Sequence, residues 1–199
     1  GRGAPGRKSQ GKVCRLTERM AKEPVSGTCG VGHTRWATHG RPSDENAHPH
    51  LAGRVAVIHN GIVENHRTLK EKLIAKGRTF RSETDSEVIA HLLDEYVSAG
   101  MPLEEAVRKT VAELRGSYAV LAVTDREPGP LVGARLNCPL VVVLGRWAVF
   151  HATDLTAFLS HQRSLLFLRA RGLASATTTV QAHTTSGSSP PAHDPTQHP

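Results

Sequence analysis

Residues 33–40 read His-Thr-Arg-Trp-Ala-Thr-His-Gly, residues 46–50 read Asn-Ala-His-Pro-His, and residues 59–65 read His-Asn-Gly-Ile-Val-Glu-Asn. These three clusters fall within 33 residues and contain five histidines. A hydrophobic core has little use for so many polar side chains, whereas an ordered loop region of this length is usually functional. The clusters therefore predict a binding or catalytic site built from loops.

The segments around these clusters predict a mixed α and β domain. Residues 54–59 (Arg-Val-Ala-Val-Ile-His) have the length and the β-branched content of a buried strand. Before it we expect a short helix at residues 12–22 and an extended segment at residues 28–35. After it come three amphipathic helices, at residues 65–76, 84–98 (with Ser82 or Thr84 as its cap) and 103–114. Short β-type runs follow at residues 117–124, 131–134, 140–144, 148–152 and 164–168. This order of elements favours an α+β layered fold.

The two ends of the chain differ in composition from its middle. Residues 1–10 are small and basic, show no periodicity, and are expected to be a flexible start. Residues 170–199 are rich in Ala, Thr, Ser, Pro and His, a composition that buries too little apolar surface to become ordered. We therefore expect one globular domain over residues 11–169 and a disordered tail over residues 170–199.

The net charge of +7 comes from the ends of the chain. Residues 1–32 hold seven Lys and Arg against two acidic residues, and residues 161–199 hold three against one. Residues 33–160 therefore hold 15 of each. A nucleic-acid binder, the alternative that such a charge raises, needs a basic stripe on its folded part. The neutral middle of the chain argues against that alternative.

Other classes of protein are disfavoured by what the sequence lacks. No apolar run approaches the ~20 residues of a membrane helix, and residues 1–10 lack the apolar region of a signal peptide, so we expect a cytoplasmic protein. Three widely spaced cysteines suggest neither a disulfide scaffold nor a zinc site. His48 and His50 have no third ligand at a usable spacing, so we expect no metal and no cofactor.

In order and spacing, the three clusters resemble the glutaminase domain of the glutamine–fructose-6-phosphate aminotransferase family. The similarity continues through residues 114–119, 134–140, 152–154 and 163–168, and covers roughly residues 11–168. It implies the fold of N-terminal-nucleophile hydrolases, an αββα layered sandwich, here incomplete at its N-terminus. It also implies hydrolysis of L-glutamine to glutamate. The ammonia would then serve to convert fructose 6-phosphate to glucosamine 6-phosphate on a second, isomerase domain.

The resemblance assigns roles to individual residues. Arg35 and Asp85 are expected to hold the α-carboxylate and the α-ammonium group of glutamine. Asn60 and Gly61 are expected to supply the N–H donors of an oxyanion hole. The mobile loop that closes over glutamine in the family matches a segment that contains Trp36, Thr38 and His39.

Each assignment has a simpler alternative when its residue is considered alone. The Asn60-Gly61 pair is typical of a β-turn between two apolar runs. Asp85 is typical of the acidic first turn of a helix. Arg35 would fit a surface ion pair, and Trp36 would fit an ordinary packing position. The joint occurrence of the three clusters in one order favours the functional interpretation.

The chain departs from the family at the nucleophile. The family uses an N-terminal cysteine whose own α-amino group is the base, but this sequence begins Gly-Arg-Gly, so the nucleophile is absent. Cys29 is internal and lacks such an amino group, and we expect it, like Cys14 and Cys138, to be a small buried side chain. The isomerase domain is missing too, so we expect an inactive fragment of the enzyme. The alternative is a non-catalytic glutamine-binding or interaction module, and the sequence leaves its oligomeric state open.

Overall fold

The computed structural model describes residues 6–35, 41–126, 129–144, 149–153, 164–168, 172–176 and 180–184. Within these ranges lie four helices: α1 (Val13–Lys22), α2 (His66–Ala75), α3 (Glu87–Ser98) and α4 (Leu103–Glu113). The sequence predicts all four, to within three residues at each end. None of these helices combines the length and the apolar character that crossing a membrane requires.

Helix α3 begins later than the sequence predicts. Its N-terminal cap is Ser86 rather than Ser82 or Thr84. The Ser82 hydroxyl instead donates to Glu87 Oε2 at 2.6 Å and lies 2.9 Å from the Thr84 hydroxyl. The residues before α3 therefore form a hydrogen-bonded loop, and Asp85 belongs to this loop rather than to the helix.

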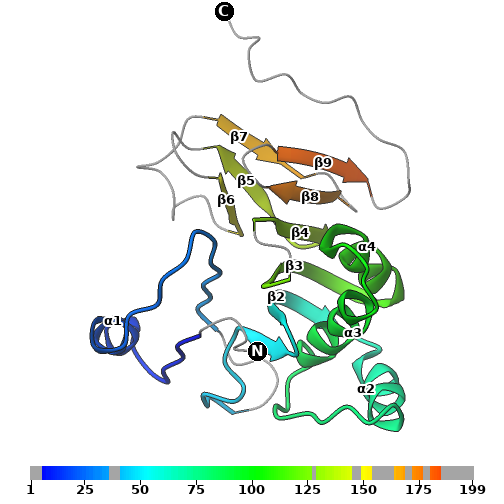
Figure 1. Cartoon of the computed structure of the whole chain (residues 1–199), viewed down its shortest axis with the longest axis horizontal. Helices are drawn as coiled ribbons and strands as arrows, with labels where there is room; N and C mark the ends of the chain where they lie inside the picture. Colours follow the sequence, from blue (N-terminus) through cyan, green and yellow to red (C-terminus); the bar gives the residue numbers. More distant parts are fainter. Residues whose placement is uncertain are drawn as a thin grey trace, which may run out of the picture.

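The strands in the described parts of the chain form two antiparallel sheets (Figure 1). The larger sheet has the order β1-β2-β3-β4-β8-β9. Its strands are β1 (His50–Ala52), β2 (Val55–Val63), β3 (Gly116–Thr124), β4 (Leu131–Leu136), β8 (Gly172–Ala176) and β9 (Val180–Thr184). The smaller sheet has the order β6-β5-β7 and contains β5 (Val141–Leu144), β6 (Val149–Ala152) and β7 (Ser164–Phe167). Strands β2 and β3 pair along their whole length.

Two hydrophobic clusters cover the two faces of the larger sheet. One lies between the sheet and the helices and includes Leu73, Ile89 and Val120. The other joins the larger sheet to the smaller one and includes Leu121 and Val142. Neighbouring residues of β3 alternate between the two clusters, as a pleated strand requires. Helices, larger sheet and smaller sheet therefore lie in three successive layers, and the predicted α+β class is confirmed.

The prediction that residues 170–199 are disordered is wrong for two segments. Strands β8 and β9 continue the larger sheet beyond β4. The side chains of Leu173 and Ala174 are fully buried, and each belongs to a different one of the two hydrophobic clusters. Composition misled the prediction because β4 supplies the partner for the backbone and the two cores supply the apolar surface. A strand placed in that setting needs few large side chains of its own.

The first described segment, residues 6–35, contributes little to either cluster. Helix α1 has no buried side chain and lies apart from the two sheets (Figure 1). An ion pair holds it to the loop before β1, with Arg19 Nη1 3.7 Å from Asp44 Oδ2. Residues 28–35, expected to be extended, pair with no strand within the described residues, although Val31 packs against the second cluster.

Candidate functional site

The Asn60-Gly61 pair lies inside strand β2. Asn60 is opposite Ala119 and Gly61 is opposite Tyr118 in the pairing with β3, so the β-turn alternative is wrong. Gly61 has a φ of +126°, and a Cβ atom at this position would lie 2.1 Å from the carbonyl oxygen of Ser117. Only glycine tolerates both this conformation and this approach. The absence of a side chain keeps β3 close to β2 beside Asn60.

The Asn60 carboxamide has a partner at each end. His33 Nε2 lies 2.6 Å from Asn60 Oδ1, and Asn60 Nδ2 donates to Thr153 Oγ1 at 3.2 Å. These partners are 27 and 93 residues away in the sequence. The amide is therefore fixed by the segment that contains His33 on one side and by Thr153, directly after β6, on the other.

The Asp85 carboxylate lies beside the end of the same strand. Only 4% of this residue is exposed, and its Oδ2 accepts a hydrogen bond from the backbone N–H of Val63 at 2.8 Å. Val63 is the last residue of β2. The hydrogen bond ties the carboxylate to the strand that carries Asn60 and Gly61, and the simpler role as a helix first-turn residue does not account for it.

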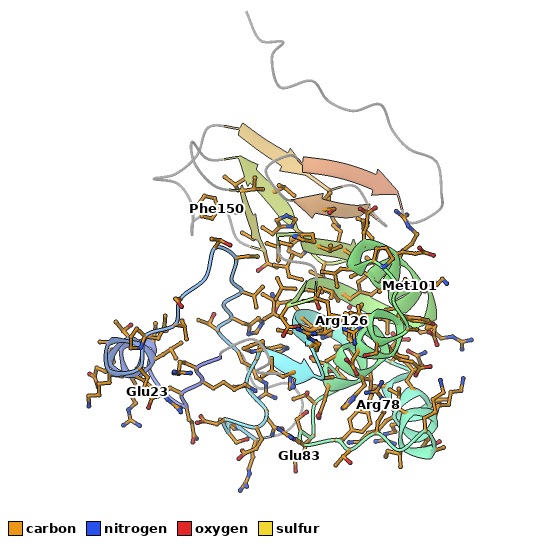
Figure 2. All side chains as sticks on the ribbon, in the orientation of Figure 1. Glu23, Arg78, Glu83, Met101, Arg126 and Phe150 are labelled. Atoms are coloured by element: carbon orange, nitrogen blue, oxygen red, sulfur yellow. The ribbon has the colours of Figure 1, made fainter. Side chains whose placement is uncertain are left out.

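Asn46 joins two loops at the site. Its Nδ2 donates to the Arg41 carbonyl oxygen at 3.0 Å and to Glu83 Oε2 at 3.3 Å, and its Oδ1 accepts the N–H of Glu83 at 2.9 Å. Glu83, labelled in Figure 2, belongs to the same loop as Asp85. The sequence cluster that starts at Asn46 signals this position, but the bridge to Glu83 is visible only in the structure.

Glu87 anchors the loop that holds Asp85 from its other end. Its carboxylate accepts the backbone N–H groups of Arg81 at 2.9 Å and of Ser82 at 2.7 Å. Burial raises the pKa of Glu87, but His91, whose Nε2 lies 3.6 Å from Oε1, and the hydrogen bonds from Ser82 and the backbone outweigh it and lower the pKa to about 2. The charged carboxylate at neutral pH therefore holds the loop in place.

Four histidines, His33 half-buried and His48, His50 and His59 buried, lie close to these loops. The ring centroids of His33 and His48 lie 4.1 Å apart, and those of His48 and His50 lie 4.8 Å apart. Burial lowers the pKa of all three, and that of His50 falls to about 4. Burial also lowers the pKa of His59, which hydrogen-bonds Ser86 at 2.9 Å, to about 4. The site is therefore lined by neutral imidazoles at pH 7.

Charges of both signs act on one of these imidazoles. Burial is the main cause of the low pKa of His50, and the positive charges of Lys8 and Arg35 lower it further. The negative charges of Glu87 and Asp85 raise it. Arg35 and Asp85 are far apart in the sequence, but hydrogen bonds connect the segments that carry them. The Arg41 carbonyl oxygen accepts from both Arg35 and Asn46, and Asn46 in turn bonds Glu83, in the loop that carries Asp85.

Three predicted residues, Trp36, Thr38 and His39, lie outside the described residues. The two ends of their segment are described and lie close together. Arg35 Nη1 donates to the carbonyl oxygen of Arg41 at 3.5 Å, which joins the residue before the segment to the residue after it. Arg41, the first described residue after the segment, also bonds Asn46 through the same carbonyl oxygen.

The prediction that the cysteines are buried is wrong. Cys14 and Cys29 are exposed, and Cys138 is half-buried. Nearby protein atoms nevertheless remove enough water from the Cys29 thiol to raise its pKa, against a weaker, opposing hydrogen bond at Gly30. A raised pKa leaves less thiolate, the opposite of what a nucleophilic cysteine requires.

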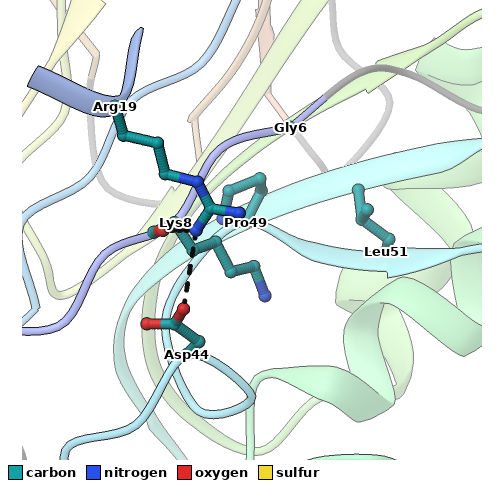
Figure 3. Close-up of a pocket in the computed structure, with 6 residues that line it drawn as sticks. All are labelled: Gly6, Lys8, Arg19, Asp44, Pro49 and Leu51. Carbon is teal, nitrogen blue, oxygen red and sulfur yellow. Dashed lines mark hydrogen bonds and ion pairs between the residues drawn. The ribbon is translucent and has the colours of Figure 1, made fainter. Parts of the chain in front are cut away.

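A hollow of about 250 Å³ lies beside Pro49 and Leu51, the two neighbours of His50 in the sequence (Figure 3). Its lining residues are Gly6, Lys8, Arg19, Asp44, Pro49 and Leu51. It contains none of the predicted site residues, so we regard it as separate from the site. In the described ranges no three His, Cys, Asp or Glu side chains are placed to hold a metal ion.

A sequence model of the glutamine amidotransferase domain matches residues 33–160 of the chain. The chain belongs to the glutamine amidotransferase family. This amidotransferase domain is 46% identical, over 164 residues, to the glutamine–fructose-6-phosphate aminotransferase (isomerizing) of Methanothermobacter thermautotrophicus. It is also 46% identical, over 167 residues, to the enzyme of that name from Escherichia coli K12. The family resemblance predicted from the sequence is confirmed.

The matches cover most of the amidotransferase chain and a small part of its relatives. They include 81% and 84% of the chain, but only 28% and 27% of the two aminotransferases. Two solved structures also share the fold at 24% identity. The glutamine phosphoribosylpyrophosphate amidotransferase of B. subtilis, complexed with ADP and GMP, has a TM-score of 0.65 over 79% of this chain and 35% of its own. The allosteric regulatory enzyme of purine biosynthesis has a TM-score of 0.63 over 73% and 32%.

Proposed function

We propose that this chain is the glutaminase part of a glutamine–fructose-6-phosphate aminotransferase and that it binds L-glutamine. The identity of 46% with aminotransferases over four-fifths of the chain supports this substrate. Fructose 6-phosphate would be the acceptor of ammonia on a separate isomerase domain, as the names of the relatives suggest. A cytoplasmic location follows from this role in sugar-phosphate metabolism.

The hydrogen bonds that connect Arg35, through the Arg41 carbonyl and Asn46, to the loop of Asp85 carry the proposal. Glutamine is a zwitterion at neutral pH, and its binding requires a cation and an anion a few ångströms apart. Arg35 would hold the α-carboxylate through its forked N–H donors, and Asp85 would hold the α-ammonium group. The neutral histidines between them contribute no competing charge at pH 7. A low-charge lining of this kind strengthens both ionic contacts.

The side chain of glutamine would then extend toward β2. Attack on its amide produces a tetrahedral oxyanion, which two preorganised N–H donors stabilise. Asn60 Nδ2 and the backbone N–H of Gly61 are the proposed donors. The segment that contains Trp36, Thr38 and His39 would close over the bound glutamine and exclude water.

The three cysteines of the chain do not fit the role of the nucleophile. Two of them are exposed, and the thiol of Cys29 has a raised pKa. We propose that hydrolysis needs an N-terminal cysteine with a free α-amino group, which none of Cys14, Cys29 and Cys138 provides. We also propose that the fold is the αββα sandwich of N-terminal-nucleophile hydrolases. The helices, the larger sheet and the smaller sheet described above would correspond to three of the four layers of that sandwich.

Calorimetric titration of the chain with L-glutamine tests the proposal through Asp85→Asn. The variant keeps the shape of the side chain and removes its charge. Truncating one partner of a buried charge pair costs about 2–5 kcal/mol, so we expect the affinity to fall by about 30-fold or more. D-glutamine and L-glutamate serve as comparison ligands.

Asp125→Asn is the matched control. Asp125 also loses a charge in this variant, but its ion pair with Arg54 lies before the start of β2, about 20 Å from Asn60 at the usual rise per strand residue. We expect it to bind glutamine like the unmodified chain. If the unmodified chain binds no glutamine, or if both variants bind equally well, the proposed function is wrong.

A further inference from the structure

The two contacts of the Asn60 carboxamide decide which of its atoms faces the proposed oxyanion. An oxyanion hole needs the N–H side of an amide, and a carboxamide that rotates by a half-turn would present its oxygen instead. In the structure, Asn60 Oδ1 lies against His33 Nε2 and Asn60 Nδ2 lies against Thr153 Oγ1. One of the two N–H bonds of the amide serves Thr153, and the other remains for a ligand.

The contact with His33 has a defined polarity. The carboxamide oxygen accepts hydrogen bonds only, so with Oδ1 toward His33 the matching form of the ring carries its proton on Nε2. His33 Nδ1 is buried and has no hydrogen-bond partner among the described residues. A buried nitrogen with only a lone pair is more common in proteins than a buried N–H without an acceptor. Both ring nitrogens therefore favour the Nε2–H form.

The ring of His33 is itself held in place. It packs against His48 at a centroid distance of 4.1 Å, and His48 packs edge-on against His50 at 4.8 Å. His50 Nε2 in turn lies 3.0 Å from Thr84 Oγ1, in the loop that carries Asp85. A continuous row of contacts thus connects the Asn60 amide to the loop of the proposed ammonium partner.

We propose that His33 is a positioning residue, which holds the Asn60 carboxamide so that an N–H bond, rather than the oxygen, points to the reacting amide of glutamine. The inference rests on the proposed function of Asn60. Thr153 holds the other end of the carboxamide, and the His48 ring packs against His33. A neutral ring suits this role, and burial together with the charge of Arg35 lowers the pKa of His33.

The proton position on His33 can be measured in the chain itself. Long-range ¹H–¹⁵N correlation spectra of the ¹⁵N-labelled protein distinguish the Nε2–H and the Nδ1–H forms of each histidine. At pH 7 we expect His33 to be neutral with its proton on Nε2. A proton on Nδ1 would overturn the proposal, because Nε2 would then accept a hydrogen bond and the Asn60 amide would face the other way.

Two variants separate positioning from general support of the fold. His33→Gln places an amide N–H near the position of Nε2, whereas His33→Phe keeps a planar ring and removes the donor. In the Gln variant we expect the Asn60 side-chain amide signals to stay close to their original positions and glutamine binding to be kept. In the Phe variant we expect these signals to move toward those of a free asparagine. Binding should weaken about tenfold, the usual effect of one lost hydrogen bond.

The possible results lead to different conclusions. Equal glutamine binding and equal Asn60 signals in the Gln and Phe variants would overturn the positioning role. If the Phe variant does not fold, the proton position in the unmodified chain still decides. If the unmodified chain binds no glutamine, the proposed function fails. The Nε2–H form and the shift of the Asn60 signals would then still show whether His33 orients this amide.

Discussion

Gly61→Ala tests the close approach of β2 and β3 at the proposed oxyanion hole. The new Cβ would lie 2.1 Å from the Ser117 carbonyl oxygen, so the backbone of one strand must move. A non-glycine residue forced to a φ of +126° adds about 1–3 kcal/mol of backbone strain, and overpacking adds about 1–3 kcal/mol. The sum, about 2–6 kcal/mol, is a large part of the stability of an ordinary domain, about 5–15 kcal/mol.

Urea unfolding followed by circular dichroism measures this loss. With a slope of about 2 kcal/mol per M, we expect the midpoint for Gly61→Ala to fall by about 1–3 M. Gly77→Ala is the matched control, because Gly77 also has a positive φ of +85° but a Cβ there would meet nothing within 4 Å. Its expected loss is about 1–2 kcal/mol, from the backbone alone. Equal losses for the two variants would show that β2 and β3 do not approach each other as described.

Three other predictions concern the histidines, the loop bridge and the tail. Burial lowers the pKa of His50 and of His151 to about 4, so both are neutral when folded and charged when unfolded below pH 6.5. Above pH 6.5 neither group affects the free energy of unfolding. Between pH 6.5 and pH 4 each group should lower it by about 1.4 kcal/mol per pH unit, which urea midpoints measure, and His151→Leu should make this slope shallower. Asn46→Ala should lower the free energy of unfolding by about 1–3 kcal/mol and weaken glutamine binding, since it removes the bridge to Glu83; unchanged binding would contradict that link. Leu173→Ala should reduce the free energy of unfolding by about 2–5 kcal/mol and so lower the melting temperature, whereas the same change in a disordered tail would leave the melting temperature unchanged.

The helices could be predicted from the sequence because their signals are local. Apolar residues recur at helical spacing in α2, and Gly77 directly after it has the positive φ of a helix end. The start of α3 was placed too early because Ser82 and Thr84 look like caps. In the structure the Ser82 hydroxyl hydrogen-bonds Glu87 and the Thr84 hydroxyl hydrogen-bonds His50, and a local pattern does not reveal these contacts.

The residues of the site could be named from the sequence, but their arrangement could not. The Asn60-Gly61 pair looks like a turn in the sequence. The reason for a glycine there is the Ser117 carbonyl of β3, a strand more than 50 residues away, which a local pattern does not contain. The partner of Asn60 Nδ2, Thr153, is 93 residues away, and no spacing rule predicts such a contact. For the same reason the sequence does not predict that β8 is an ordered strand, because its burial depends on pairing with β4 and not on its own composition.

The place of β8 in the larger sheet also determines when the sheet can be completed during translation. Strands β2 and β3 and the three helices between them are complete once residue 124 has left the ribosome, whereas β4 waits for its second neighbour until residue 176. The 35 residues between β4 and β8 take about 2–7 s to add at ordinary translation rates. The whole smaller sheet is made within that interval. A nascent chain therefore carries an open side on β4 for seconds, and this is the stage at which a ribosome-bound chaperone would encounter it.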